Sequence, residues 1–461
     1  MAVLLLVFLV FVLGLFISTA LLRWNEMKYR KKGLPPGTMG WPVFGETTEF
    51  LKQGPNFMKN QRARFGQFFK SHLLGSPIVV SMDPEVNRYI LLNESKGLVP
   101  GYPQSMLDIL GKSNIAAVHG PAHKSMRGAL LNIISPTMIR DQLLPKVDEF
   151  MRFHLSNWDG KTVDIQEKTK EMALSSTLKQ IGIESYSAAL KPEFYKLVQG
   201  TISLPIDLPG TNYGCGLQAR KNIIGILRNI LEERRASPAV QHDMLGGLMR
   251  YEDCGQKLSD EVIMDQIITL LYSGYETVST TSMMTVKHLH DHPKALQQMR
   301  EEHSEIRKRK GTGEPIDWND YKSMKFTRAV ILESMRLATI VNGVLRKTTH
   351  DMELNGFFIP KGWRIYVYLR EANHDPLIYP EPLTFNPWRW EDRNLEYHNN
   401  FMLFGGGTRL CPGKEMGMVE ISTFLHYFMT TYRWEEVGGQ NLEKFPRVQA
   451  PNGLHIKVSN N

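Results

Sequence analysis

A cysteine in a glycine-rich segment has the surroundings that best suit metal chemistry in this chain. Cys411 lies two residues after Arg409 and two before Gly413, and residues 405–407 are all glycine. In a tight loop the backbone N–H groups can point at the sulfur, and a cysteine thiolate there can bind an iron ion. Such a ligand pushes electron density toward iron and favours cleavage of the O–O bond of dioxygen. The alternative is a glycine-rich turn with a buried free cysteine.

An acid beside an alcohol, Glu276 and Thr277, is the second feature that suits oxygen chemistry. Protons must reach the outer oxygen of dioxygen before its O–O bond breaks. Thr277 can donate a hydrogen bond to that oxygen, and Glu276 can connect it to solvent as a proton relay. The alternative is a threonine-rich helix with one ordinary glutamate.

A long predicted helix, residues 261–290, positions this acid and alcohol, and Ser259 or Asp260 can cap it. Its first half is apolar almost all round, which predicts burial in the core. Serine and threonine side chains near Glu276 compete for backbone carbonyl groups, so we expect a local widening of the helix there.

The segments around Cys411 suggest how the chain positions its sulfur. An irregular stretch, about 376–401, leads into the cysteine segment, and a helix is expected over residues 414–427. The positive end of that helix would lie just after the cysteine and help to hold a thiolate. Residues 138–310 are mainly helical by pattern, whereas short segments such as 77–82 indicate strands. The pattern predicts a mainly α protein with small β-sheets.

Three charged residues precede the cysteine segment and suit a structural role. Glu333 and Arg336 are three residues apart on one face of a predicted helix, and Arg389 follows in the irregular stretch. A buried carboxylate shared by two arginines is plausible only if every group is hydrogen-bonded. The alternative is an ordinary surface ion pair.

The segment from Phe404 to Gly413 resembles the haem-binding signature of the cytochrome P450 enzymes at every fixed position. These enzymes are the type example of cysteine-thiolate ligation of haem iron. The resemblance implies the cytochrome P450 fold, a haem b with Cys411 as its iron ligand, and monooxygenase activity. It also implies that electrons come from NADPH through a cytochrome P450 reductase.

The same resemblance assigns roles to further residues. Glu276 and Thr277 match the oxygen-activation motif, as does Gly274, whereas Ser273 and Val278 depart from it. Glu333, Arg336 and Arg389 match the structural triad that locks the cysteine loop. The haem contacts implied are His123, which stands where many relatives have Trp, together with Arg127, Arg346, Phe404, Arg409 and Gly413.

The N-terminus predicts a membrane anchor. Residues 1–22 are apolar and uncharged, long enough to cross a bilayer as one helix, and basic residues follow. Positive charge stays on the cytoplasmic side, so the body should be cytosolic. A cleaved signal peptide is the alternative. Residues 23–37 form a basic, proline-rich hinge and residues 38–461 the catalytic domain; this plan resembles that of microsomal enzymes and implies a single-pass protein of the endoplasmic reticulum membrane.

Composition narrows the partners and the compartment. The chain has 461 residues, a formal net charge of +8 and three cysteines. Three cysteines do not form a disulfide framework, and a reducing compartment fits them better. The basic residues are scattered and no recognition motif accompanies them, so we expect no nucleic acid partner; an anionic membrane surface or an acidic protein fits instead.

Apolar segments beside the motifs predict the substrate pocket. They favour a lipophilic, steroid-sized substrate, although a terpenoid or fatty acid would suit the same composition. The pocket residues expected are Tyr102, Met106, Leu110, Leu270, Ser273, Thr339, Ile340 and Val341.

Over its full length the chain is similar to the plant brassinosteroid C-6 oxidases, the Dwarf-type cytochromes P450. Residues 34–42, 98–105, 272–281 and 338–349 carry the match. The resemblance implies hydroxylation of a 6-deoxo steroid at C-6 and then oxidation to the ketone, which some relatives extend to a lactone.

Three alternatives remain from the sequence. The first is a cytochrome P450 hydroxylase of another lipophilic plant metabolite, such as abscisic acid or a triterpenoid. The second is a reductase-independent hydroperoxide isomerase, and the third is a non-catalytic haem protein. The Glu276–Thr277 pair argues against the last two, because neither needs a proton relay.

Overall fold

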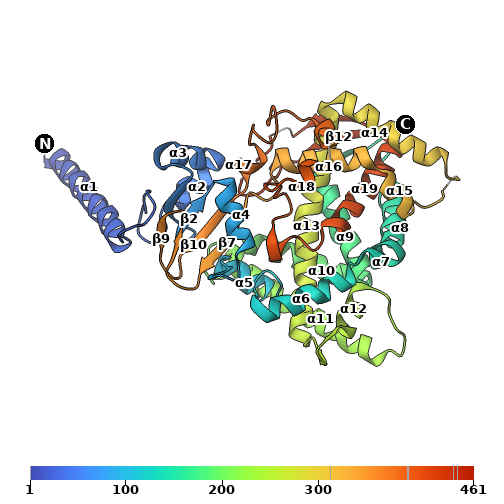
Figure 1. The fold of residues 1–461 in the computed structure, drawn as a ribbon, viewed down its shortest axis with the longest axis horizontal. Helices are drawn as coiled ribbons and strands as arrows, with labels where there is room; N and C mark the ends of the chain where they lie inside the picture. Colours follow the sequence, from blue (N-terminus) through green and yellow to red (C-terminus); the bar gives the residue numbers. More distant parts are fainter. Residues whose placement is uncertain (1, 312, 392–393, 440, 444) are drawn as a thin grey trace. The chain divides into compact units, whose positions relative to one another are not determined.

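The chain divides into two compact units, and Figure 1 shows its elements coloured along the sequence. This computed structural model describes residues 2–311, 313–391, 394–439, 441–443 and 445–461. Unit 1 comprises Met1–Gly101 and Val341–Ala372, and unit 2 comprises Tyr102–Ile340 and Asn373–Asn461.

Unit 1 is built on a sheet with the strand order β1–β2–β10–β7–β3. β2 and β10 pair in parallel, and the other neighbours are antiparallel. β-branched and aromatic residues dominate the central strands and are buried, which suits a pleated core surface. The elements are α1 (Ala2–Lys28), α2 (Thr47–Gln53), α3 (Pro55–Phe65), β1 (Phe68–Leu73), β2 (Ser76–Ser81), α4 (Pro84–Leu92), β3 (Leu98–Pro100), β7 (Gly343–Thr348), β8 (Met352–Leu354), β9 (Phe357–Ile359), β10 (Arg364–Tyr368) and α17 (Arg370–Asn373).

The N-terminal helix α1 has the length and composition of a membrane span. Residues Val3–Lys28 meet both criteria, and the most apolar 18-residue window of this helix is not buried within the protein. The helix continues past residue 22, so the first basic residues of the predicted hinge belong to its last turns. Asn25 fixes this end, because its side-chain amide donates to the carbonyl groups of Met39 and Gly40 at 3.0 and 2.9 Å.

Unit 2 is mainly helical and contains the cysteine loop. Its helices are α5 (Gln104–Leu110), α6 (Gly120–Ile133), α7 (Pro136–Met138), η1 (Ile139–Leu143), α8 (Leu144–His154), α9 (Ile165–Ile181), η2 (Glu184–Tyr186), α10 (Ser187–Thr201), α11 (Asn212–Ala236), α12 (Met244–Arg250), α13 (Asp260–Asp291), α14 (Pro293–Lys308), α15 (Trp318–Ser323), α16 (Lys325–Ala338), η3 (Pro387–Trp390), α18 (Asn394–Tyr397), η4 (Gly407–Arg409) and α19 (Lys414–Thr431). Its strands are β4 (Thr162–Asp164), β5 (Glu252–Asp253), β6 (Gln256–Lys257), β11 (Tyr432–Gly438) and β12 (His455–Asn460).

The long helix α13 lies at the centre of this unit and packs against α9, α16 and α19 (Figure 1). The predicted helix over residues 261–290 is confirmed, and the Ser259 side chain caps it by accepting from Val262 N at 3.4 Å. The expected widening is wrong, since α13 stays α-helical throughout. The hydroxyl of Thr277 instead donates to Ser273 O at 2.8 Å. This carbonyl group also takes part in the backbone hydrogen bonds of the helix, so the bond does not widen the helix.

The prediction of a helix directly after Cys411 is also confirmed. α19 begins at Lys414 and its buried apolar residues join the core of unit 2. The stretch expected to be irregular, residues 376–401, contains only the short helices η3 and α18 among its described residues.

Candidate active site at the cysteine loop

Glycines shape the cysteine loop, residues 404–413, which contains η4 and ends where α19 begins. Gly405 and Gly407 have φ angles of +75° and +63°, a region that side chains with a Cβ rarely adopt. The backbone N–H of Cys411 donates to Phe404 O at 2.9 Å and closes the loop. The loop thereby holds the cysteine immediately before the first turn of α19.

The surroundings of Cys411 fit a thiolate ligand of iron. The residue is exposed, yet enough protein surrounds it that desolvation raises the pKa of its thiol. Three groups act in the opposite direction: the backbone N–H of Gly413, which donates to the sulfur, and the charges of Arg127 and Lys414. A metal that displaced the thiol proton would create a negative charge that these groups stabilise. The donor set therefore fits a haem iron.

A buried carboxylate braces the segment that leads into this loop. Glu333 in α16 is fully buried and accepts both Nε and Nη2 of Arg336, at 2.9 and 2.8 Å. It also accepts Arg389 Nε at 3.1 Å, Trp390 Nε1 at 2.8 Å and the backbone N–H of Asn386 at 2.9 Å. Burial alone would raise the pKa of Glu333, but the hydrogen bonds and the charge of Arg336 hold it below its ordinary value.

The two arginines carry this brace into the backbone of the irregular stretch. Arg336 donates to the carbonyl groups of Asn373 and Pro382 at 2.8 and 2.7 Å, and Arg389 donates to Pro380 O at 2.9 Å. The structure thus brings together the three charged residues proposed as a structural triad. The sequence indicated only the order of these residues along the chain. Their hydrogen bonds to backbone carbonyl groups show which parts of the irregular stretch they hold.

An aromatic row links the brace to the cysteine loop. The ring of Trp390 lies 5.9 Å from that of Phe401, which lies 6.3 Å from Phe404. Phe404 is partly buried against the same cluster. Because Cys411 bonds Phe404 O, a movement of the brace would be transmitted to the loop that holds the sulfur.

One face of α13 becomes progressively more open toward its middle. Gln266, Leu270, Ser273 and Thr277 follow one another at helical spacing and share this face. Gln266 is fully buried, Leu270 is half-buried, and Ser273 and Thr277 are exposed. Thr277 is therefore accessible, and its hydroxyl would have to turn away from Ser273 O to donate to a ligand.

Glu276 lies on the neighbouring face of α13 and is held by an arginine. Arg447 Nη1 lies 3.2 Å from Glu276 Oε1, and its Nη2 donates to Thr201 Oγ1 at 2.8 Å. The ammonium group of Lys170 is also close to Glu276. Desolvation lowers the pKa of Lys170 overall, and the negative charge of Glu276 acts in the opposite direction. The acid and Thr277 therefore point in different directions in this structure, and a turn of the Glu276 side chain must accompany any proton transfer between them.

Two of the predicted haem contacts lie beside the cysteine loop. Arg127 in α6 donates to Leu410 O at 2.8 Å, and His123 is buried one turn before it. Arg409 donates to the carbonyl groups of Ile115 and Val118, at 2.6 and 2.5 Å.

The remaining predicted haem contacts are placed as follows. Arg346 lies in β7 of unit 1, is buried, and has its Nε 3.5 Å from Glu94 Oε2. Gly413 is the residue before α19 and supplies the N–H that bonds the sulfur. The roles of all these residues toward haem stay predictions.

The predicted pocket residues fall into two groups. Tyr102, Met106, Leu270, Ile340, Ser273 and Val341 are at least partly accessible, the last of them in unit 1. Leu110 and Thr339 are almost fully buried. Leu110 packs into the core of unit 2, and the Thr339 hydroxyl donates to Arg336 O at 3.1 Å at the end of α16. This differs from the expectation. A residue that lines a pocket needs an accessible side chain, and these two side chains are buried against other residues.

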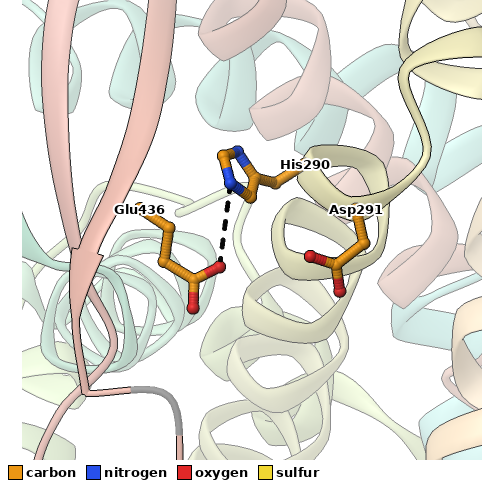
Figure 2. Close-up of side chains that lie close together, drawn as sticks. All are labelled: His290, Asp291 and Glu436. Carbon is orange, nitrogen blue, oxygen red and sulfur yellow. Dashed lines mark ion pairs between the residues drawn. The ribbon is translucent and has the colours of Figure 1, made fainter.

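A second cluster of potential ligands lies at the other end of α13 (Figure 2). His290, Asp291 and Glu436 bring their ligating atoms within 4.8 Å of one another. Lys287 lies among them, with its ammonium 2.7 Å from Asp291 and 3.1 Å from Glu436. The lysine already supplies the cation that the two carboxylates need, so this cluster is an ion-pair network.

Several contributors to the site were missed from the sequence. Trp390 and Asn386 complete the shell of Glu333, and the former adjoins Arg389 in the segment already singled out. Arg447 is far from Glu276 along the chain, and no motif marks it.

Comparison with known proteins agrees with this geometry. The family model described as Cytochrome P450 matches residues 35–458. A "Cytochrome P450 85A" of Phaseolus vulgaris is 71% identical, covering 98% of this chain and 97% of the relative. A "Cytochrome P450 85A1" of Solanum lycopersicum is 70% identical, covering 98% and 99%. A solved structure described as the retinoic acid bound cyanobacterial CYP120A1 is 29% identical with a TM-score of 0.86, covering 94% of this chain and 100% of that one.

These findings confirm the fold class and the resemblance to brassinosteroid C-6 oxidase-type enzymes expected from the sequence. They imply a haem iron cofactor. The chain belongs to the cytochrome P450 family and is one of its monooxygenases.

Proposed function

We propose that this cytochrome P450 oxidises a 6-deoxo brassinosteroid at C-6, first to the alcohol and then to the ketone. The observation that carries the proposal is similarity of about 70% identity over nearly the whole chain to cytochromes P450 of the 85A group, in a chain whose cysteine loop suits thiolate ligation. The segments that resemble brassinosteroid C-6 oxidases include both the α13 motif and the region after α16.

The two oxidations balance with dioxygen and NADPH. In the first, the C-6 hydrogen of the steroid is replaced by hydroxyl, one oxygen atom enters the product, and the other leaves as water with two electrons and two protons. In the second, the alcohol loses two hydrogens to become the ketone, and a further dioxygen takes these two hydrogens, two electrons from NADPH and two protons and leaves as two waters. Each cycle thus consumes one NADPH.

The residues around Cys411 would hold the cofactor. A haem b bound there supplies the dioxygen chemistry that no amino acid side chain provides. Cys411 would be the iron ligand, with the Gly413 N–H stabilising its charge, and Phe404 would pack beside it. Cationic contacts to the haem carboxylates would come from His123, Arg127, Arg346 and Arg409.

Proton delivery would fall to α13. The Thr277 hydroxyl on the accessible face would position a proton at the reacting oxygen, and Glu276 would replenish it from solvent. Glu276 is only about one-fifth exposed at its side chain and is paired with Arg447, so it must leave this partner to serve the relay. Glu333, Arg336 and Arg389 would have no part in proton transfer and would fix the loop.

The electron donor and the membrane location of this protein are also part of the proposal. We infer that a flavoprotein reductase delivers electrons from NADPH, and that a redox partner docks on the basic surface of a protein with net charge +8. The apolar helix α1 suits a membrane anchor. We place the anchor over residues 1–22, the hinge over 23–37 and the catalytic domain over 38–461, with the domain on the cytosolic face of the endoplasmic reticulum.

Turnover of a 6-deoxo brassinosteroid by the purified full-length protein, with reductase and NADPH, tests this function. We expect mass spectrometry to show a 6-hydroxy product that is later replaced by the 6-ketone. Omission of NADPH should abolish both products, which separates this activity from that of a hydroperoxide isomerase. Protein with an intact thiolate-type CO spectrum and no product from the steroid would refute the substrate assignment.

A further inference from the structure

A buried ion pair in unit 2 lies outside the machinery described above. Asp265 in α13 is 1% exposed, and Arg220 in α11 donates to its Oδ1. The second oxygen, Oδ2, accepts the backbone N–H of Ser113 at 3.0 Å, and Arg220 also donates to Ile109 O at 3.2 Å. One ion pair therefore bonds both the last turn of α5, at Ile109, and the segment that follows it, at Ser113.

The next residue of α13 holds the same segment. Gln266 is fully buried, its amide nitrogen donates to Ser113 O at 2.9 Å, and its oxygen accepts Ile115 N at 3.2 Å. We define residues 111–118 as the strap. Arg409 of the cysteine loop also bonds the strap, through the carbonyl groups of Ile115 and Val118.

A glycine is required where the strap approaches Asp265. Gly111 has a φ of +99°, and a Cβ added there would collide with the Asp265 carboxylate. Its conformation and its missing side chain let the backbone come close enough for Ser113 to reach the carboxylate. The position of the strap is therefore set by the ion pair and its close packing.

The strap stands at one end of the α13 face that carries Thr277. Gln266, which bonds the strap, and Thr277 share this face and are eleven residues apart, or about 16 Å at the helical rise. Leu270 and Ser273 lie between them. α5, which precedes the strap, packs against α10, α11 and α13, and its Met106 is partly accessible. The strap and α5 together form a wall at a fixed distance from the proton donor.

We propose that the Arg220–Asp265 pair is a specificity determinant, which positions this wall and so decides where a rigid lipophilic substrate lies along α13. The two residues are positioning residues, since neither side chain is placed to touch the substrate. The proposal rests on the proposed function only for the identity of the steroid.

The test removes both charges together. An Arg220→Met/Asp265→Asn variant avoids leaving a buried charge unpaired, which would be strongly destabilising. A matched control is Arg234→Met/Asp243→Asn. That pair also joins an α11 arginine to a buried aspartate, at 2.8 Å, and its aspartate likewise faces a glycine, Gly182, where a Cβ would not fit. Its further hydrogen bonds, to Gly182 and Gly246, are made outside the strap.

Two haem ligands of different size provide the first measurement in the haem-loaded enzyme. We expect a bulky aromatic azole to bind the double variant about tenfold more weakly, a loss of about 1.4 kcal/mol, because the wall that it would contact is displaced. Free imidazole, which is too small to reach the wall, should keep its affinity within about twofold. The reduced-CO spectrum should be unchanged.

Product analysis provides the second measurement. With the 6-deoxo steroid, the variant should oxidise positions other than C-6, while the control variant should keep the wild-type product ratio. Arg220→Lys keeps one donor to Asp265 and should show an intermediate loss of azole affinity, which keeps the test open if the double variant fails to fold.

Three results would overturn the proposal: unchanged affinity for the bulky azole, an equal loss for imidazole, or an equal loss in the control pair. The azole measurement does not use the steroid. If the wild-type enzyme leaves the steroid unoxidised, the substrate assignment fails and the role of the ion pair is still decided.

Discussion

Two glutamates of this enzyme, Glu333 and Glu276, occupy opposite kinds of environment. Glu333 is fully buried and accepts hydrogen bonds from two arginines, a tryptophan and a backbone N–H. Glu276 accepts from Arg447 Nη1 at 3.2 Å, and its side chain is 19% exposed. A carboxylate with every lone pair used cannot leave its site, whereas one with a single partner can turn. This difference supports the proposal that Glu333 has a structural role and that Glu276 carries the proton.

The largest expected effect is the loss of the buried carboxylate. Glu333→Gln leaves Arg336 and Arg389 buried without a counter-charge, which should cost about 3–5 kcal/mol of stability. We expect haem content and the reduced-CO signal to fall together, with a lowered unfolding temperature. Glu396→Gln is the matched control, because Glu396 also accepts two bonds from one arginine, Arg328, but is 20% exposed. Equal losses in the two variants would remove the distinction.

The same carboxylate predicts sensitivity to acid. The pKa of Glu333 is lower in the folded protein than its ordinary value, so its stabilising contribution is complete above that ordinary value and is lost as pH falls through the folded-state pKa. Unfolding temperatures measured from pH 7 down to pH 3 should fall more steeply in wild type than in Glu333→Gln. Parallel curves would contradict the assignment.

A third carboxylate sharpens the comparison, because it is buried without a cation. Glu420 in α19 has Gln180 Nε2 as a donor at 3.3 Å, and burial raises its pKa to about 7. Folding therefore favours its protonated form, and stability is lost as pH rises from about 4.5 to 7. Glu420→Gln should stabilise the protein at pH 8 by about 3 kcal/mol, at 1.36 kcal/mol per pKa unit. A variant that is no more stable than wild type at pH 8 would show that the carboxyl is not held neutral.

A smaller effect is expected at the proposed proton donor, Thr277, which is accessible. Thr277→Ala removes the hydroxyl on the accessible face of α13, and product formed per NADPH consumed should fall about tenfold, below the 10²–10⁴-fold typical of a lost acid–base group, because water can partly replace it. Hydrogen peroxide release should rise correspondingly. Thr281→Ala is the control, since Thr281 lies one turn further along and is buried. Unchanged coupling in Thr277→Ala would refute the relay.

The smallest effect should come from Arg389→Lys. The lysine keeps a charge near Glu333 but loses the fork that also bonds Pro380 O, so we expect about 1 kcal/mol of destabilisation with normal coupling. Thermal unfolding and NADPH coupling measured on one preparation check both halves. A change in coupling without a change in stability would place Arg389 with the proton relay.

Sequence reasoning found residues that lie close together in the chain and missed partners that come from far away. Cys411 and its glycines form a contiguous segment, and the periodic pattern of α13 is long, so both were predictable. Arg447 reaches Glu276 from 171 residues away, and Asp265 meets Ser113 from 152 residues away. Such pairs depend on tertiary packing, which a single sequence does not encode in any local pattern. The burial of Leu110 and Thr339 was missed for the same reason.

The origin of the oxygen atom at C-6 tests the central claim most directly. The full-length enzyme would be supplied with reductase, NADPH, the 6-deoxo steroid and ¹⁸O-labelled dioxygen, and the 6-hydroxy product analysed by mass spectrometry before it becomes the ketone. We predict that the hydroxyl oxygen carries the label and that labelled water contributes none. A 6-hydroxy product with oxygen from water, or oxidation confined to other carbons of the steroid, would contradict a C-6 monooxygenase.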